Sequence, residues 1–191
     1  MPVIGPNIGI PELSPNPFEP LGSFLTYPFV IVSGGNSPYS TMDELATYAQ
    51  DNDVVLGHFG APLIPTKVTF ALAQQKGFSY AADAAFDMLD CNTLASGAGE
   101  RSSLTPDTPT VGELDPSLTL ALWNGLFVHK DTPADVREKI IAVAEETMAS
   151  ERAQQFAAET GALVYWQNAA DTQAQIEADT AALAKINAML E

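Results

Sequence analysis

The residues best suited to chemistry in this sequence lie in one short loop. Residues 57–66 read Gly-His-Phe-Gly-Ala-Pro-Leu-Ile-Pro-Thr, between a predicted strand over Asp53–Leu56 and a predicted helix that begins at Pro65 and stops at Gly77. The main-chain N–H groups of such a loop and the positive end of the helix dipole point at one spot, which suits a small anion. The candidate donors are the main-chain amides of Phe59, Gly60, Ala61, Leu63, Ile64 and Thr66, the Thr66 hydroxyl and the His58 ring.

Two interpretations of this loop stay open at the level of the residues. In the first, it is a cradle for a carboxylate, and Phe59, Leu63 and Ile64 wall an apolar ligand body. In the second, the loop is an ordinary connection between a strand and a helix, and the same three apolar side chains only pack it against the protein. Lys67, in the first helical turn, is the first basic residue of the chain. Lys67 either pairs with a bound anion or points to water, because a cation at a helix N-terminus is unfavourable when no anion is bound there.

Other chemically capable residues indicate structure rather than catalysis. Trp123 lies with Gly125 in a predicted strand, where a tryptophan is either core or the wall of a ligand site. Cys91 with His58 or His129 would be a nucleophile pair, but Cys91 has helical spacing within an apolar segment, which favours a small buried side chain. No pair of carboxylates is placed for acid–base work. The sequence therefore predicts a protein that is not an enzyme.

Charge and cysteine content exclude several classes of function. The chain has 191 residues, of which 24 are acidic and 8 are basic, so its net charge is -16. This balance argues against nucleic acid and anionic membrane surfaces as partners, because both need clustered Lys and Arg. The single cysteine excludes an intrachain disulfide and a Cys-rich zinc site, and no cofactor is expected. The first residues lack the basic and apolar regions of a signal peptide.

Strands and helices are predicted to alternate along the chain, which indicates an α/β fold. Residues 1–27 hold six prolines, a density that predicts an extended segment and argues against a central strand. The other predicted strands are Phe29–Val32, residues 118–128 around Gly125, and Ala162–Trp166.

Helix starts are predicted from capping residues. Thr41, Thr132, Ser150 and Asn168 are the predicted caps, and a further helix is predicted over Ala84–Leu94. Residues 101–116 are rich in Pro, Thr and Asp and are expected to form a surface loop. The helix after Thr132 is expected to bury a stripe made of Val136, Ile140, Val143 and Thr147, and the last helix a stripe made of Ile176, Leu183 and Ile186.

Several stretches together resemble one protein family. Arg101-Ser-Ser-Leu-Thr-Pro-Asp-Thr-Pro-Thr-Val-Gly-Glu113 is similar to the pattern R-S-x-x-L-P-D-V-P-T-V-x-E of the Bug-type substrate-binding proteins of tripartite tricarboxylate transporters. Trp123-Asn-Gly-Leu-Phe-Val-His-Lys-Asp-Thr-Pro133 is similar to W-F-G-L-F-A-P-A-G-T-P of the same family. Weaker likenesses are Phe18–Phe24 to D-P-L-x-D-F, Thr41–Ala46 to T-V-A-E-L, and the loop after Gly57 to Y-G-S-x-G-x-G-S-x-x-H-L. The resemblance covers nearly the whole chain from Phe18 onward.

The resemblance implies a type II periplasmic-binding-protein-like α/β fold whose two lobes close on a small organic carboxylate. The first lobe would hold residues 1–27 and 129–191, and the second lobe, with the cradle, residues 28–128. Carried over by position, the ligand-binding residues would be Asn7, His58, Phe59, Gly60, Ala61, Leu63, Ile64, Thr66, Lys67 and Trp123. The parent family is periplasmic, and the membrane components of its transporter would be the partners.

The chain departs from the family pattern in two places. The first strand of lobe one with its P-A-G-G-x-x-D loop, and a strand–helix–strand between Gly99 and Arg101, have no counterpart. A fold truncated relative to the two-lobed family is therefore expected, and lost strands leave unpaired edges. The alternative function is consequently a non-binding scaffold or interaction domain, with a homo-oligomer that buries those edges.

Overall fold

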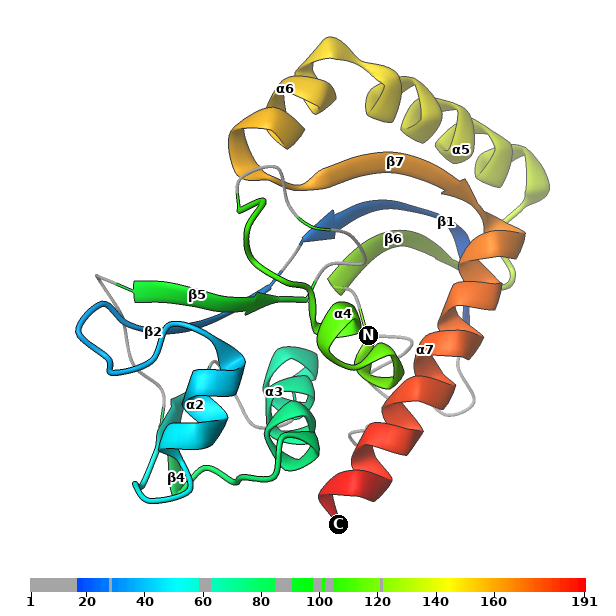
Figure 1. Ribbon diagram of the computed structural model, residues 1–191. Helices are drawn as coiled ribbons and strands as arrows, with labels where there is room; N and C mark the ends of the chain where they lie inside the picture. Colours follow the sequence, from blue (N-terminus) through cyan, green and yellow to red (C-terminus); the bar gives the residue numbers. More distant parts are fainter. Residues whose placement is uncertain are drawn as a thin grey trace. The chain divides into compact units, whose positions relative to one another are not determined.

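The computed structural model describes residues 17–27, 29–58, 63–84, 91–97, 101, 105–120 and 122–191, without the side chains of residues 82–84, 91 and 92. Strands and helices alternate along much of this part (Figure 1). In chain order they are β1 (Phe18–Tyr27), β2 (Val30–Gly34), α2 (Met42–Tyr48), β3 (Val55–Gly57), α3 (Ile64–Gln75), β4 (Ala82–Ala84), β5 (Cys91–Ser96), α4 (Val111–Leu114), the 3-10 helix η2 (Pro116–Leu118), β6 (Leu122–His129), α5 (Ala134–Ala149), α6 (Glu151–Thr160), β7 (Leu163–Asn168) and α7 (Ala169–Leu190).

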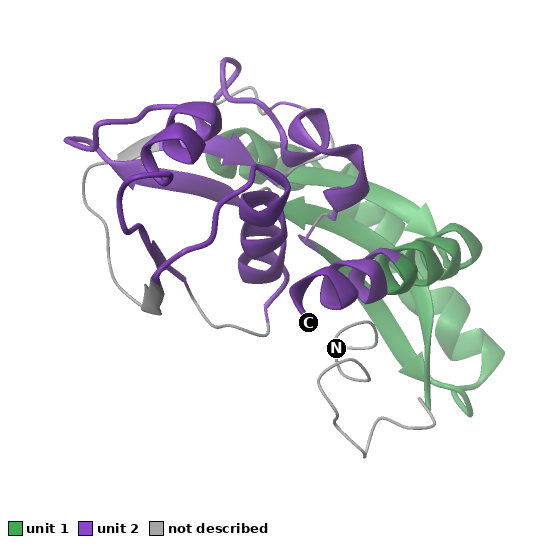
Figure 2. Ribbon diagram, turned by 60° about the horizontal axis from the view of Figure 1, so that its bottom comes forward, with its two compact units in different colours: residues 1–27, 123–181 green, residues 28–122, 182–191 purple. Residues whose placement is uncertain are grey.

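The chain divides into two compact units (Figure 2). Unit 1 is residues 1–27 with 123–181, and unit 2 is residues 28–122 with 182–191. Unit 1 includes all of β6 except Leu122, and the end of α7 from residue 182 onward belongs to unit 2. The lobe boundaries that the resemblance implies, with residues 28–128 as one lobe, remain a prediction.

Unit 1 is built on a three-stranded sheet in the order β6-β1-β7. β1 and β7 are antiparallel, from Gly22 opposite Asn168 to Thr26 opposite Leu163. The expectation that the proline-rich start excludes a central strand is wrong, since β1 lies in the middle and contains Pro20. The register explains why: pairing with β7 begins only at Gly22, so Pro20 lies before the stretch that needs an N–H on that side.

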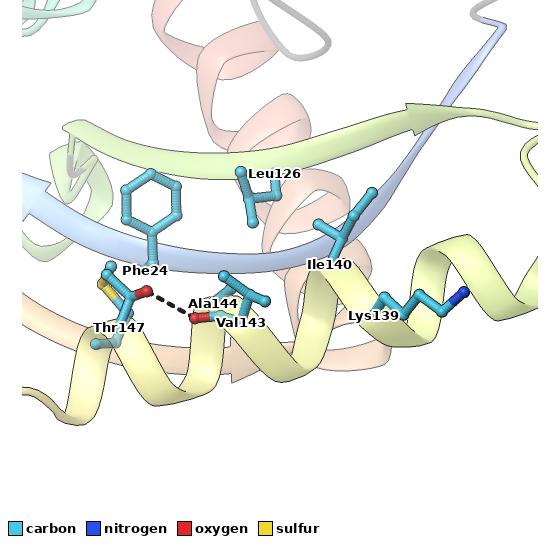
Figure 3. A pocket seen from close by; sticks show the side chains of 8 residues that line it. Phe24, Leu126, Lys139, Ile140, Val143, Ala144 and Thr147 are labelled. Carbon is cyan, nitrogen blue, oxygen red and sulfur yellow. Dashed lines mark hydrogen bonds between the residues drawn. The ribbon is translucent and has the colours of Figure 1, made fainter.

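The helix α5 packs on β7 and β1, and its buried side chain differs from those predicted. The expected buried stripe is wrong, because Val136 is 38% and Val143 is 64% exposed. Ala144 is the buried residue of α5 instead. Ile140, Val143 and Thr147 line an open apolar groove between α5 and the sheet (Figure 3), so these side chains face the sheet without being covered by it. Arg137 forms an ion pair with Glu19 on β1 and donates to main-chain oxygens before the helix.

Unit 2 holds two small two-stranded sheets, an antiparallel β2–β5 pair and a parallel β3–β4 pair. The predicted helix over Ala84–Leu94 is wrong at its described ends, because β4 finishes at Ala84 and β5 begins at Cys91. Leu94 and Ala95 are 2% and 0% exposed, respectively. β5 reads Cys-Asn-Thr-Leu-Ala-Ser, a run too short and too mixed for local spacing to separate a strand from a helix.

The end of the predicted surface loop is also ordered and buried. α4 and η2 occupy residues 111–114 and 116–118, and Val111 and Leu118 are each 1% exposed. η2 packs on α3, whose Val68 and Leu72 are both fully buried. The motif that ends at Glu113 thus delivers apolar side chains to the core as well as forming a connection.

Three of the four predicted caps are confirmed and one is wrong. Thr41, Ser150 and Asn168 each accept a hydrogen bond from a main-chain N–H of the following turn, at 3.1, 3.2 and 3.0 Å, respectively. Thr132 lies one residue too early, because Pro133 is the N-cap of α5 and supplies no side-chain hydrogen bond. The prediction took Pro133 as the first helical residue, whereas α5 begins at Ala134, so the predicted cap lies one position too early.

Candidate functional site

The candidate cradle is described at its two ends. His58 directly follows β3 and is half-buried, and Leu63 is the N-cap of α3. Leu63 supplies no side-chain hydrogen bond to the helix, and Pro65 removes one main-chain donor from the first turn. The Lys67 amide closes that turn by donating to the Leu63 carbonyl at 3.1 Å. The start of α3 therefore lacks the polar cap that most of the other described helices carry.

The electrostatics of this helix start are unusual for so acidic a chain. The other described α-helices all carry Asp or Glu in the first turn, whereas α3 carries none. Acidic side chains settle at helix N-termini because they face the positive end of the dipole. The chain has a net charge of -16, and its acid-free start makes α3 less repulsive to an external anion than the starts of the other described α-helices.

The predicted site residues at the start of α3 differ in exposure. Leu63 is 38% exposed, whereas Ile64 and Thr66 are 7% and 3% exposed. His58 and Thr66 each take part in an interaction within the protein. The hydroxyl of Thr69 donates to the Pro65 carbonyl at 2.8 Å, which further fixes the first turn. Leu63 is thus the most exposed of the predicted site residues described at the start of α3.

The side chain of Lys67 forms a hydrogen bond within unit 2. Its ammonium donates to the Asn187 side-chain oxygen at 2.5 Å, which ties the start of α3 to the end of α7. Neither of the two alternatives weighed for Lys67, an anion or water, included this contact. A ligand role for Lys67 remains a prediction. Four other predicted site residues, Asn7, Phe59, Gly60 and Ala61, lie outside the described residues.

Trp123 belongs to unit 1 and uses its only polar atom there. Its indole N–H donates to Asp179 on α7 at 2.6 Å, and its ring stacks on Phe127 with 6.3 Å between centroids. Asp179 is 6% exposed and also accepts a hydrogen bond from Gln175 at 2.7 Å. Burial raises the pKa of Asp179 above its ordinary value, and the two donors oppose that shift. The binding role of Trp123 remains a prediction.

The most specific sequence motif forms an ionic clamp across a loop. The Arg101 guanidinium donates to both carboxylate oxygens of Glu113, at 2.8 and 2.6 Å, and to the Pro106 carbonyl at 3.2 Å. Glu113 also accepts from the Thr110 amide, completing a capping box at the start of α4. These bonds, Arg101 first, lower the pKa of Glu113 to about 2. The two ends of the motif thus hold a turn together.

Two other chemically capable residues, His129 and Cys91, belong to different units. His129 contacts Asp131 at 3.3 Å and lies edge-on to Phe18 at the end of β6 in unit 1, whereas Cys91 begins β5 in unit 2. No group of three or more His, Cys, Asp or Glu residues among the described ones is placed to hold a metal ion. Within the same residues, every helix is too short or too polar to span a bilayer.

Comparison with known proteins gives a consistent result at the level of fold. No protein-family model matches the chain, and neither does any curated protein. A solved structure of the periplasmic binding protein BugD matches 88% of this chain and 68% of its own, with a TM-score of 0.72 and 20% identity. An R. palustris protein with adipate matches 90% and 68%, with a TM-score of 0.76 and 16% identity.

A third solved structure is MatC from Rhodopseudomonas palustris with bound malate. It matches 91% of this chain and 70% of its own, with a TM-score of 0.67 and 18% identity. These TM-scores show a shared fold, and the chain spans roughly two thirds of each matched chain. The expected fold class is therefore confirmed: this chain has the α/β fold of the Bug-type periplasmic solute-binding proteins that its motifs resemble.

Proposed function

We propose that this protein binds a small organic carboxylate and delivers it to the membrane components of a tripartite tricarboxylate-type transporter in the periplasm. The shared fold supports the proposal, because two of the matched structures hold adipate and malate, both dicarboxylates. The observation that carries it is the start of α3, the described α-helix with no acidic residue in its first turn in a chain of net charge -16. A helix start of this kind is a ready site for one carboxylate group.

The ligand class follows from what surrounds that helix start. Leu63 offers an exposed apolar side chain beside the first-turn donors, and Ile64 lies buried next to it. A dicarboxylate with methylene groups between its ends satisfies both surfaces, since one carboxylate meets the N–H groups and the chain covers Leu63. Adipate is therefore expected to bind more tightly than malate, which carries a hydroxyl on a shorter chain.

Thermal unfolding with a panel of acids tests the proposal. Adipate, malate and citrate are compared with adipamide, which has the shape of adipate and no charge. A ligand that binds the folded state stabilises it by roughly 2.7 kcal/mol at a hundredfold excess over Kd, which shifts Tm by several degrees. We expect at least one acid to raise Tm while adipamide does not. Equal shifts with adipamide, or none with any acid, would contradict the proposal.

A substitution at the N-cap of α3 separates the helix start from other anion sites. Leu63→Asp adds the side chain that helix N-termini prefer, so it leaves the fold as stable or more stable. It also places a negative charge about 5 Å from a bound carboxylate, which costs roughly 1–3 kcal/mol across the effective dielectrics of a protein surface. That penalty corresponds to a loss of about 5- to 150-fold in affinity.

The matched control is Leu63→Asn, which caps the helix equally well without the charge. We expect the Asp variant to bind adipate several-fold more weakly than the Asn variant, with the gap narrowing at high salt. If both variants bind like the parent chain, the carboxylate lies elsewhere and the start of α3 is not the site.

A further inference from the structure

Lys67 lies on the same side of α3 as the N-cap Leu63. It follows Leu63 by four residues, and side chains four residues apart lie one above the other on a helix. A helical side chain also leans toward the N-terminus of its helix, so the Lys67 side chain covers the turn that begins at Leu63. The Lys67 ammonium can therefore reach an anion that binds the N–H groups of this first turn.

The structure turns this ammonium toward the end of α7. The Nζ atom of Lys67 donates to the Oδ1 atom of Asn187 at 2.5 Å, and both residues belong to unit 2 (Figure 2). Both are half-buried. Leu183 and Ile186, which precede Asn187 on α7, are 2% and 0% exposed, so a well-packed stretch of helix presents the Asn187 amide. The contact thus joins two firmly held elements.

A neutral amide is an unusual partner for a half-buried ammonium in this chain. Several Lys and Arg side chains of the described residues form ion pairs with Asp or Glu, namely Lys76, Arg101, Arg137 and Lys139. Within the same residues, Lys67 has an amide oxygen as its partner, although the chain holds 24 acidic residues against 8 basic ones. An ammonium binds a carboxylate more strongly than an amide, because opposite charges attract. A carboxylate at the start of α3 can therefore draw the ammonium away from Asn187.

We propose that Asn187 is a positioning residue of the candidate carboxylate site: it holds the Lys67 ammonium at the first turn of α3 until a bound carboxylate takes the ammonium over. This inference rests on the proposed carboxylate function. Because Lys67 must leave Asn187 to meet the ligand, the strength of the Lys67–Asn187 contact subtracts from the affinity. The same contact makes the site select for charge, since a neutral group does not outcompete the amide.

Two substitutions of Asn187 change the strength of this contact in opposite directions. Asn187→Asp gives Lys67 a carboxylate of its own, so adipate must compete with an ion pair. We expect the Kd for adipate to rise by about two- to fivefold. Asn187→Leu removes the acceptor and keeps a side chain of similar size, so the ammonium is free to meet the ligand. We expect the Kd for adipate to fall by about two- to fivefold in this variant.

The matched control is Ala188→Asp, which adds the same charge at the next position of α7, where the residue is exposed. This variant reproduces the general repulsion between a new acid and adipate, and it leaves the contact between Lys67 and Asn187 in place. Lys67→Met combined with each Asn187 variant completes a double-mutant cycle. The urea midpoint of every variant shows whether a change in affinity is a change in stability instead.

Calorimetric titration of the full chain with adipate gives the Kd of each variant. We expect Asn187→Leu to bind more tightly than the parent chain, Asn187→Asp more weakly, and Ala188→Asp about as tightly as the parent. We also expect the difference between Asn187→Leu and Asn187→Asp, beyond the effect of Ala188→Asp, to vanish in the Lys67→Met background. Equal affinities of Asn187→Asp and Ala188→Asp, or a difference that survives Lys67→Met, would overturn this inference and leave the carboxylate function standing. Failure of every diacid to bind would remove the proposed function, and this inference with it.

Discussion

The buried pair of Trp123 and Asp179 gives a sharp test of how unit 1 is held together. The Asp179 carboxylate is 6% exposed and is held by the Trp123 indole at 2.6 Å and the Gln175 amide at 2.7 Å. Trp123→Phe keeps an aromatic ring against Phe127 and removes the N–H donor together with the second ring of the indole. The variant therefore leaves a buried carboxylate with one donor fewer.

The cost follows from the loss of a hydrogen bond to a charged, buried group. Such bonds contribute roughly 1.5–3 kcal/mol, and the partner left behind is not rehydrated because it stays buried. In the Asp179→Asn background the same Trp123→Phe change removes a bond between neutral groups, which is worth about 1 kcal/mol. The difference between the two backgrounds measures the charge-dependent part.

Tryptophan fluorescence provides the assay, because the chain has two tryptophans, Trp123 and Trp166, and both belong to unit 1. Trp166 remains as the reporter in the variant. With a urea slope of about 2 kcal/mol per molar, the unfolding midpoint should fall by about 1 M. A fall below roughly 0.25 M, equivalent to about 0.5 kcal/mol at that slope, would refute the reasoning.

The same pair predicts the direction of a pH effect. The pKa of Asp179 is raised above 3.8 in the folded state because burial disfavours its charge. Between 3.8 and the folded pKa, the folded state binds more protons than the unfolded state, so stability rises as pH falls through that window. Trp123→Phe raises the folded pKa further. Its destabilisation should be smaller near the acidic end of that window than at pH 7, and equal costs at both would contradict this account.

Two further substitutions test the clamp and the sheet. Glu113→Gln should make the stability of the chain depend less on pH between 4.5 and 2. The pKa of Glu113 is lowered from 4.5 to about 2, so the parent chain loses the stability that this carboxylate contributes as pH falls from 4.5 toward 2. The variant has no such contribution to lose, which urea titrations across that range will show. Gly22→Ala should lower stability by about 1–3 kcal/mol, because its new Cβ would lie 2.5 Å from the Trp166 ring and 2.6 Å from the Gln167 carbonyl. An unchanged urea midpoint for Gly22→Ala would show that β1 and β7 separate easily.

Features set by neighbouring residues were predictable from the sequence. Thr41, Ser150 and Asn168 cap their helices because a polar oxygen and the N–H groups of the next turn come together at fixed spacing. The motif between Arg101 and Glu113 identified the fold for a related reason, since its ends bind each other and its conformation needs those residues.

Features set by distant contacts were not predictable in the same way. β5 buries Leu94 and Ala95 because β2 pairs with it, and that pairing has no local signature. Val143 stays exposed because the groove that it lines between α5 and the sheet is open, which depends on distant parts of the chain. Local periodicity therefore assigned the wrong structure to β5 and predicted burial for side chains of α5 that the structure leaves exposed.

The candidate site was predictable in part. Chain order alone placed Leu63, Ile64, Thr66 and Lys67 together at the start of α3, but it did not find Asn187 as the partner of Lys67. Asp179 was missed although a signal existed. It stands three residues after Ile176 and four before Leu183, on the stripe expected to be buried, and a buried acid there requires a donor such as Trp123.

Calorimetric titration of the full chain with adipate, malate and adipamide tests the central proposal most directly. We predict saturable binding of one equivalent of at least one diacid, no heat from adipamide, and a several-fold loss of affinity in Leu63→Asp relative to Leu63→Asn. If no diacid saturates the protein up to roughly 10 mM, weaker than about -2.7 kcal/mol, or if adipamide binds as well, the protein is not a carboxylate receptor.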